Sequence, residues 1–305
     1  MKKLKHYLSK ATNGNFAVGA INVFNLESIQ AVADASANCN SPIIAAVSEK
    51  SLIYMQDYVK SLAKSARKTN PALFLHLDHG TTFEICKKAI DLGFDSVMID
   101  ASHLPLDENI TLTKKVCCYA HKKGVLVEGE LGKILGAEEN ASSTESIYTS
   151  PEEAARFVKE TKVDMLAISI GTSHGIYKAG NGKLRFDVLQ EIEKAVPNTP
   201  LVLHGASTIN SALIDDFLAA GGKTKKHHSI DEKQLKMAAT CHHIAKINTD
   251  SDIRLCFTSA LRRTLIENPE IFAPRKYLGC AKEKIQKLIE EKIASIFNSK
   301  NKRER

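Results

Sequence analysis

The chain has 305 residues, of which 43% are hydrophobic and 25% are charged, and this composition excludes disorder as its main character. The formal net charge is +7, but aromatic residues make up only 6% and Trp is absent, which favours small anionic ligands over nucleic acid. No segment approaches the roughly 20 apolar residues of a membrane helix, and no signal peptide is recognisable. The seven cysteines include no CxxC pair. We therefore expect a cytoplasmic protein with reduced thiols and neither membrane nor nucleic-acid contact.

Short β-branched segments alternate with segments of helical periodicity along the chain. The expected strand and helix pairs are 16–23 with 26–39, 42–48 with 52–68, 72–78 with 83–92, 96–102 with 110–123, 125–131 with 151–162, 164–171 with 186–196, 200–206 with 213–220, and 243–250 with 253–267. Eight consecutive units predict an α/β fold, a closed (β/α)₈ TIM barrel, because eight parallel strands with crossover helices close into a barrel. An open doubly wound sheet is the alternative.

We predict a single domain over 1–305, with a C-terminal helical extension at about 282–298. An irregular insert at about 221–232 is rich in Lys and His, and the basic tail 300–305 is expected to be a solvated end. The segments 132–150 and 172–184 are predicted to be long loops, which in compact domains usually serve as lids or binding surfaces.

In a barrel, the functional residues gather where the strands end, since the following loops converge on one face. Three histidines, His79, His174 and His204, stand at such places, and three imidazoles with an open fourth position are suited to a catalytic zinc. Judged singly, each is better explained as a strand cap, and the convergence of all three on one face is what favours the metal. Asp78 points away from His79 on an extended strand, so it either orients a neighbour or carries a proton.

Acidic residues at neighbouring strand ends suggest a second cation site. Glu128 and Glu130 share one face of a strand, and Asp100 ends the strand beside them, although pairing with a lysine is an alternative for any of them. Phosphate cradles are suggested by small residues at 171–175, 205–208 and 248–251. Arginines 254, 262, 263 and 275 offer a further phosphate contact or, more simply, a solvated helix face.

Seven motifs occur in one order: LHLDHG (75–80), VMIDASH (97–103), VEGELG (127–132), IGTSHG (170–175), LHGAS (203–207), KINTDSD (246–252) and PRKYLG (274–279). Over nearly the whole chain they resemble the class II, zinc-dependent ketose-bisphosphate aldolases, especially the longer fructose-bisphosphate aldolases of the second subgroup. The resemblance implies that His79, His174 and His204 bind the catalytic Zn²⁺. It also implies a second divalent cation at Asp100 and Glu130.

The resemblance further implies catalytic roles for Asp78, as the proton donor, and for Glu138, on a mobile loop, as the residue that exchanges a proton with a zinc-stabilised enediolate. The dihydroxyacetone-phosphate site, with a possible monovalent cation, would comprise Gly175, Lys178, Gly205, Ala206, Ser207, Asn248, Thr249, Asp250 and Ser251. Asn22 and Ser48 would face the aldehyde half. Arg254 or Arg275, one of them from a partner subunit, would contact the distal phosphate.

The implied activity is that of a lyase of glycolysis and gluconeogenesis, which reversibly cleaves fructose 1,6-bisphosphate to dihydroxyacetone phosphate and glyceraldehyde 3-phosphate. A homodimer or homotetramer is expected. The chain has Leu135 and Thr208 where such aldolases usually have glycine, and a β-branched residue disfavours a positive φ at position 208. Two alternatives therefore stay open: an aldolase for tagatose 1,6-bisphosphate or another ketose bisphosphate, and an impaired barrel that only binds phosphometabolites.

Overall fold

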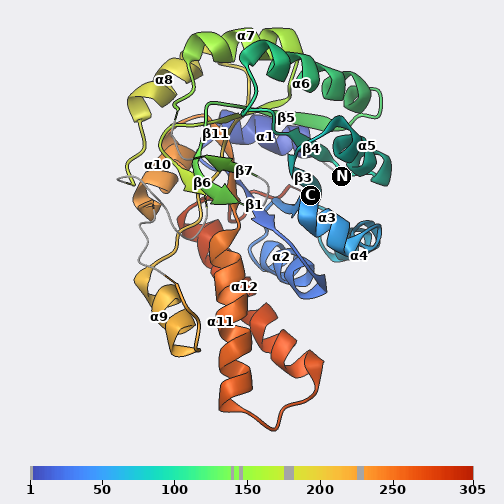
Figure 1. Cartoon of the computed structure of the whole chain (residues 1–305), viewed down its shortest axis with the longest axis vertical. Coiled ribbons are helices and arrows are strands. Elements are labelled where there is room, and N and C mark those ends of the chain that lie inside the picture. Colours follow the sequence, from blue (N-terminus) through green and yellow to red (C-terminus); the bar gives the residue numbers. More distant parts are fainter. Residues whose placement is uncertain (1–2, 139–140, 144–146, 175–181, 225–229, 305) are drawn as a thin grey trace.

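The computed structural model describes residues 3–138, 141–143, 147–174, 182–224 and 230–304. Eight parallel strands close into a barrel in the order β1-β11-β10-β8-β5-β4-β3-β2, with helices around it (Figure 1). The strands are β1 (Val18–Asn22), β2 (Ile43–Ser48), β3 (Leu73–Gly80), β4 (Ser96–Ile99), β5 (Leu126–Leu131), β8 (Met165–Ile168), β10 (Leu201–Leu203) and β11 (Ile244–Thr249). The predicted barrel is confirmed, and the closed strand order excludes the open sheet.

Most of the outer helices lie close to the predicted positions, whereas the helix at Glu232–Cys241 was not expected from the sequence. They are α2 (Leu26–Asn38), α3 (Glu49–Met55), α4 (Tyr58–Thr69), α5 (Phe83–Leu92), α6 (Leu106–His121), α7 (Pro151–Thr161), α8 (Phe186–Ala195), α9 (Ser211–Ala219), α10 (Glu232–Cys241), α11 (Ser251–Glu267) and α12 (Pro274–Ser295). The helix expected at 52–68 is divided into α3 and α4, since Gln56 has a φ of 51°. No helix in the described part of the chain is long and apolar enough to cross a membrane.

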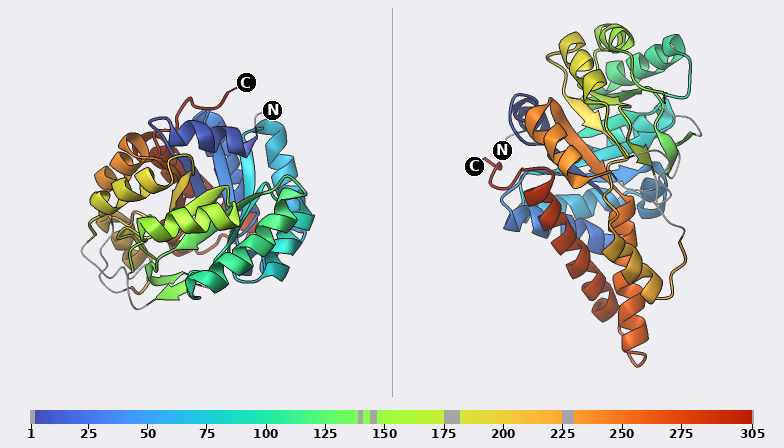
Figure 2. Two further views of the ribbon diagram at one scale, coloured as in Figure 1. Left: turned by 90° about the horizontal axis from the view of Figure 1, so that it is seen from above. Right: turned by 90° about the vertical axis from the view of Figure 1, so that its left-hand side faces the viewer.

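The end of the barrel where the strands begin is closed by α1 (Leu4–Thr12), a helix that the periodicity did not predict (Figure 2). Its buried Tyr7 and Leu8 join an apolar cluster with alternate residues of the strands, such as Phe74. Because successive strand residues face opposite sides, this cluster fills the barrel interior, while a second apolar cluster lies between the strands and the outer helices.

The basic tail also lies against this end, which corrects the expectation of a solvated end. Arg303 donates from Nε to Oδ1 of Asn40 at 2.9 Å and from Nη1 to Oδ1 of Asn70 at 3.1 Å. Ser299 is buried, and its Oγ accepts a 2.8 Å hydrogen bond from Oγ of Ser41. His6 and Lys10 of α1 pair with Glu304, so the two chain ends lie side by side.

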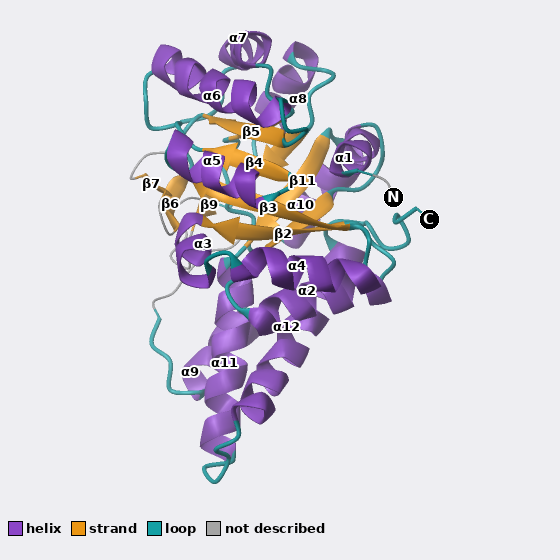
Figure 3. Ribbon diagram, turned by 90° about the vertical axis from the view of Figure 1, so that its right-hand side faces the viewer, coloured by secondary structure: helices purple, strands orange, loops and turns teal. Residues whose placement is uncertain are grey.

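The last two helices form a hairpin that projects from the barrel, with α9 beside it (Figure 3). Helix α12 begins at Pro274, with proline at its first turn, so the C-terminal helix is longer than the segment expected at 282–298. The apolar residues Ile285, Ile289 and Ile293 recur at helical spacing and are buried. They hold α12 against α2 and α11.

Short strands cover the opposite end of the barrel, within the two segments predicted to be loops. Strands β6 (Leu135–Glu138), β7 (Ala141–Ser143) and β9 (Ser173–His174) form a separate sheet in the order β7-β6-β9. Residues 225–229 of the predicted insert, including His227 and His228, lie outside the described residues, and α10 begins at Glu232.

Candidate active site

Asp78 is held between two asparagines at the carboxyl end of the barrel. Its Oδ2 accepts a hydrogen bond from Nδ2 of Asn22 at 2.9 Å, and its Oδ1 accepts one from Nδ2 of Asn248 at 2.8 Å. All three side chains are buried and come from β3, β1 and β11. The Oδ1 atoms of both asparagines are buried and have no hydrogen-bond partner among the described residues. This leaves two acceptors directed at a prospective ligand.

His79 lies beside Asp78, in contrast to the expectation that the two point to opposite sides. His79 has a φ of 47°, and the register between β3 and β4 shifts between Leu77 and Gly80. This local distortion turns two successive side chains toward the same site. The Nδ1 atom of His79 is 2.8 Å from Oδ2 of Asp100 and 4.0 Å from Oε2 of Glu130.

His204, in the loop that follows β10, is backed by a chain of fully buried polar groups. Its Nε2 is 2.7 Å from Oε1 of Glu128, whose Oε2 accepts from Nζ of Lys246 at 2.7 Å. Nζ of Lys246 is also 3.2 Å from Nε2 of His76, and Nδ1 of His76 is 2.8 Å from Oγ of Ser96. Because the carboxylate only accepts, Nε2 of His204 donates, and Nδ1 faces Asp78 at 3.9 Å.

The surrounding charges determine the protonation of this network. Burial raises the pKa of Glu128, but Lys246 and His204 lower it more, so Glu128 is ionised. Burial and the charge of Lys246 lower the pKa of His76 to about 3, which makes His76 neutral. Burial opposes a charge on His79, yet its hydrogen bond to Asp100 and the nearby carboxylates raise its pKa well above the ordinary value. Burial and Asp100 raise the pKa of Glu130 well above its ordinary value.

Two groups of side chains offer the ligand atoms of a metal centre. The ligand atoms of Asp78, His79 and His204 lie within 4.8 Å of one another, as do those of His79, Asp100 and Glu130. Oε2 of Glu130 is buried and accepts no hydrogen bond within the described part of the chain. Imidazole nitrogens with carboxylate oxygens are a donor set that suits zinc, and the clustering of like charges is relieved by a cation. The residues present therefore fit a divalent metal ion.

The loop after β10 and the start of α11 lie next to each other. They contain two of the segments predicted to bind phosphate, 205–208 and 248–251. Gly205 has a φ of 61°, and a Cβ there would lie 2.7 Å from the backbone of Ser173, so glycine is required for this close approach. Oγ of Ser207 accepts the N–H groups of Asp250 at 3.0 Å and Ser251 at 3.1 Å. Thr208 has no positive φ, so its β-branched side chain introduces no strain.

Of the remaining residues that the sequence analysis singled out, some lie at the site and one lies away from it. Ser48 ends β2 and caps α3 through the N–H of Ser51, and Thr249 ends β11 with a buried hydroxyl. Arg254 donates from Nε to Oδ1 of Asp250 at 2.6 Å, which ties it to the second cradle. Arg275, in contrast, is exposed at the start of α12, at the outer end of the hairpin, and the structure does not bring it to the site.

The lid region is described only in part. Glu138 ends β6 and His174 ends β9, and for both residues the structure describes the backbone and not the side chain. Gly175 and Lys178 lie outside the described residues. The backbone pairing of Gly136 with His174 nevertheless connects the strand that carries Glu138 to the strand that carries His174.

The sequence analysis did not single out two buried lysines that contact the site residues or the loop after β10. Lys246 is fully buried in the middle of β11, and Lys292 is 2% exposed on α12. Each had a signal, since Lys246 interrupts an apolar strand and Lys292 falls on the apolar face defined by Ile285 and Ile289. A lysine in such a position has to find a buried partner.

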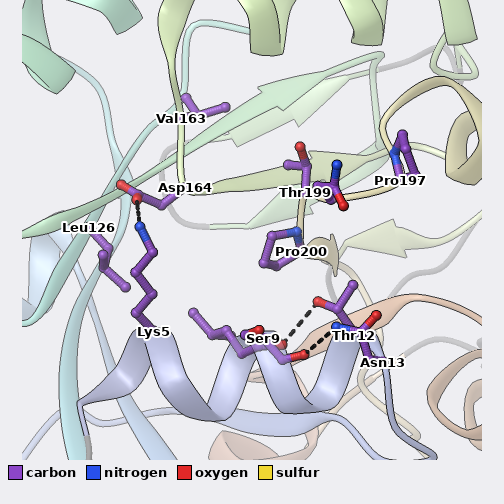
Figure 4. Close-up of a pocket in the computed structure, with 12 residues that line it drawn as sticks. Lys5, Ser9, Thr12, Asn13, Leu126, Val163, Asp164, Pro197, Thr199 and Pro200 are labelled. Carbon is purple, nitrogen blue, oxygen red and sulfur yellow. Dashed lines mark hydrogen bonds and ion pairs between the residues drawn. The ribbon is translucent and has the colours of Figure 1, made fainter.

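A cavity at the opposite end of the barrel is separate from this site. Its volume is about 380 Å³, and it lies between α1 and the segments that precede β5, β8 and β10 (Figure 4). Lys5 and Asp164 face one another across it, with Nζ and Oδ1 3.6 Å apart. The described residues that line this cavity do not form a polar cluster like the one at the carboxyl ends of the strands.

Comparison with known proteins places the chain in a family. The fold and the site define an α/β-barrel enzyme with a potential metal centre at the carboxyl ends of its strands. The family model for class-II fructose-bisphosphate aldolase matches residues 2–302, and the chain belongs to this family.

Relatives and solved structures support the same assignment. The chain is 41% identical to the fructose-bisphosphate aldolase of Treponema pallidum (strain Nichols) over 317 residues, which cover 97% of this chain and 95% of the relative. It is 43% identical to that of Thermus caldophilus over 300 residues, 96% of each chain. The crystal structure of the YdjI aldolase from Escherichia coli K12 superposes with a TM-score of 0.79 at 29% identity and covers 100% of both chains.

Proposed function

We propose that this protein reversibly cleaves fructose 1,6-bisphosphate to dihydroxyacetone phosphate and glyceraldehyde 3-phosphate, with the help of bound zinc. The observation that carries the proposal is the meeting of Asp78, His79 and His204 at the carboxyl end of the barrel, with ligand atoms within 4.8 Å. Membership of the class-II family supports the reaction and a phosphorylated sugar as substrate.

His79, His174 and His204 would hold the catalytic Zn²⁺, and Asp100 and Glu130 would bind a second divalent cation. Bound zinc acts as a Lewis acid that stabilises negative charge on the substrate oxygens. Neighbouring carboxylates orient two of the three histidine ligands. The ionised Glu128 accepts from Nε2 of His204, which leaves Nδ1 as the ligand atom, and Asp100 accepts from Nδ1 of His79, which leaves Nε2.

Asp78 would act as the general base in cleavage and the general acid in condensation. In cleavage it would take the proton of the hydroxyl on the fourth carbon, and in condensation it would return that proton to the aldehyde oxygen. Asn22 and Asn248 fix both carboxylate oxygens, and their free amide oxygens would accept hydrogen bonds from substrate hydroxyls. The pairing of β6 with β9 supports Glu138 as the residue that exchanges a proton with the three-carbon fragment.

The substrate phosphates would bind at two places. One is the cradle formed by Gly175, Lys178, the loop 205–207 and residues 248–251, with a monovalent cation. The small residues of this loop allow an anion to approach the backbone closely, and the positive end of the α11 dipole favours a negative charge there. The other place would involve Arg254, together with Arg275 from a partner subunit. Ser48 would face the aldehyde half.

We further propose a single catalytic domain that assembles as a homodimer or homotetramer in the cytoplasm. The projecting hairpin supports self-association, because the apolar Ile266 and Phe272 near its outer end are exposed. The free cysteines, three of which are exposed, fit a reducing compartment. Light scattering at several protein concentrations would measure the assembly.

The test is a coupled cleavage assay on fructose 1,6-bisphosphate with the protein as purified, after a chelator, and after zinc is restored. We expect activity that the chelator removes and zinc recovers. A parallel assay with tagatose 1,6-bisphosphate measures the epimer preference at the fourth carbon. Preference for tagatose would change the substrate and keep the mechanism. Zinc-loaded protein that cleaves neither sugar would refute the proposal.

A further inference from the structure

A buried lysine at the base of the hairpin reaches the loop that follows β10. Nζ of Lys292 on α12 is 2.7 Å from Oγ1 of Thr208 and 2.5 Å from Oδ2 of Asp252. The same Oδ2 accepts the N–H of Thr208 at 2.9 Å. These three residues, called the Lys292 brace below, connect α12, the loop after β10 and the first turn of α11.

The Lys292 brace is an unfavourable way to stabilise the fold, because it removes two charged groups from water. Lys292 and Asp252 are 2% and 0% exposed, so both charges have lost their hydration. A buried ion pair commonly contributes less to stability than well-packed apolar residues of similar volume. Since Lys292 shares the apolar face of α12 with Ile289, an apolar residue there would extend that face. The cost indicates a role in the loop that Lys292 contacts.

The loop and α11 are fastened at two successive positions. Ser207 accepts the N–H groups of Asp250 and Ser251, and Thr208 binds both Asp252 and Lys292. The loop after β10 and the start of α11 are the two segments assigned above to the substrate phosphate. Two segments that contact the same anion bind it well only if they keep a constant separation.

We propose that Lys292 is a positioning residue for the substrate phosphate. It clamps Thr208 to Asp252 and thereby fixes the separation of the two segments. It also neutralises the carboxylate of Asp252, which stands in the first turn of α11 and would otherwise repel an anion bound at that helix end. The inference rests on the proposed function, because that function supplies the phosphate.

The test compares Lys292→Met with the matched control Lys282→Met. Lys282 lies on the same helix, and its Nζ is 2.8 Å from Oδ2 of Asp34 at a partly exposed position away from the loop. Three quantities are measured on the zinc-loaded protein: KM and kcat for fructose 1,6-bisphosphate, the Kd for inorganic phosphate by calorimetry, and amide hydrogen exchange over 201–210 and 248–256. Lys292→Met is expected to raise KM and the phosphate Kd by about tenfold, with kcat changed much less. Lys282→Met should change none of them.

A second variant, Thr208→Val, keeps the test decisive if Lys292→Met does not fold. Valine preserves the shape of threonine and removes one acceptor of Lys292 without leaving an unpaired charge. We expect the phosphate Kd to rise by about three- to tenfold. Faster exchange at the amides of Thr208, Asp250 and Ser251 would accompany it, which a defect confined to the hairpin would not produce.

The two proposals fail in different ways. Wild-type protein that neither cleaves the sugar nor binds phosphate would refute the proposed function, whereas hydrogen exchange would still report the clamp. If folded Thr208→Val protein retains the wild-type phosphate Kd, KM and loop exchange, the positioning role of Lys292 is wrong. That role is equally wrong if Lys292→Met and Lys282→Met behave alike.

Discussion

The two halves of the barrel interior differ in the side chains that the same strands direct inward. The lower half is the one where the strands begin, and the upper half is the one at their carboxyl ends. The lower half is apolar, and α1 seals it; its inward residues are Val18, Ala20, Ile44, Ala46, Phe74, Met98, Met165, Ala167 and Val202. The upper half is polar although equally buried; its inward residues include Asn22, His76, Asp78, Glu128, His204, Lys246 and Asn248. One step of two residues along β3, from Phe74 to His76, crosses the border between the halves.

The two halves obey different physical requirements. Apolar side chains in the lower half need only complementary shape, so their contribution is to stability. Each polar group in the upper half needs a specific partner, as Lys246 needs Glu128 and Asp78 needs its two asparagines. Substitutions in the upper half should therefore affect chemistry, and also stability where they leave a buried charge unpaired, whereas substitutions in the lower half should affect stability alone.

The largest effect is expected from Asp78→Asn. The amide has nearly the volume of the carboxylate but cannot accept the substrate proton, so kcat/KM should fall by about 100- to 10,000-fold. The measurement is the coupled cleavage assay at saturating zinc. Zinc content and the urea midpoint should remain close to wild type, because the loss concerns a proton and not the fold.

Asn248→Ala provides the comparison for this variant. It removes one of the two donors to Asp78 and leaves the carboxylate in place, so it should retain more activity than Asp78→Asn. Undiminished turnover by zinc-loaded Asp78→Asn protein would show that another group carries the proton.

Lys246→Met should have the largest effect on stability. It leaves the carboxylate of Glu128 buried without its cation, and breaking a buried pair in this way costs about 3–5 kcal/mol. Urea unfolding of the variant measures this loss. The double variant Lys246→Met with Glu128→Gln removes both charges and should recover much of the free energy of unfolding. A double variant no more stable than Lys246→Met would mean that the two charges do not interact.

The barrel and most of the upper half could be predicted from the sequence for a simple reason. Parallel strands buried on both sides read as apolar runs, and a polar residue at the end of such a run stands out, as Asp78, His204 and Asn248 do. The direction of Asp78 relative to His79 was not predictable. It depends on the positive φ of His79 and on a register shift, and a non-glycine residue carries no marker for either.

Contacts between residues far apart in the sequence could not be predicted either. Lys246 and Glu128 are 118 residues apart, and Lys292 lies 84 residues from Thr208, so no spacing along the chain connects them. The α1 helix was missed because it is short and carries many polar residues, although Tyr7 and Leu8 are buried only once the barrel exists. Tertiary contacts, and not local periodicity, decide such elements.

Leu8→Ala tests the lower half. Leu8 is buried in the apolar cluster, and its truncation should cost about 2–4 kcal/mol of unfolding free energy. The neighbouring Ser9→Ala, at an exposed position, should cost almost nothing. Both variants should retain the wild-type kcat and KM at a temperature where they are folded. A marked fall in kcat for folded Leu8→Ala protein would mean that the two halves are coupled.

The smallest effect concerns two adjacent thiols. Cys117 is buried and Cys118 is exposed, so an alkylating reagent at pH 8 should modify Cys118 and spare Cys117 in the native protein, as mass spectrometry can show. Burial raises the pKa of the Cys117 and Cys256 thiols to about 12 from the ordinary 9.0.

The raised pKa has a consequence for stability with a definite sign. The folded state keeps these thiols protonated, while the unfolded chain ionises them above about pH 9. Their contribution is therefore fully present below pH 9 and is lost as the pH rises toward 12. Cys117→Ser should retain activity and reduce the fall in the urea midpoint between pH 9 and pH 10.5. An equal fall for wild type and variant would show that ionisation of Cys117 is not linked to unfolding in this range.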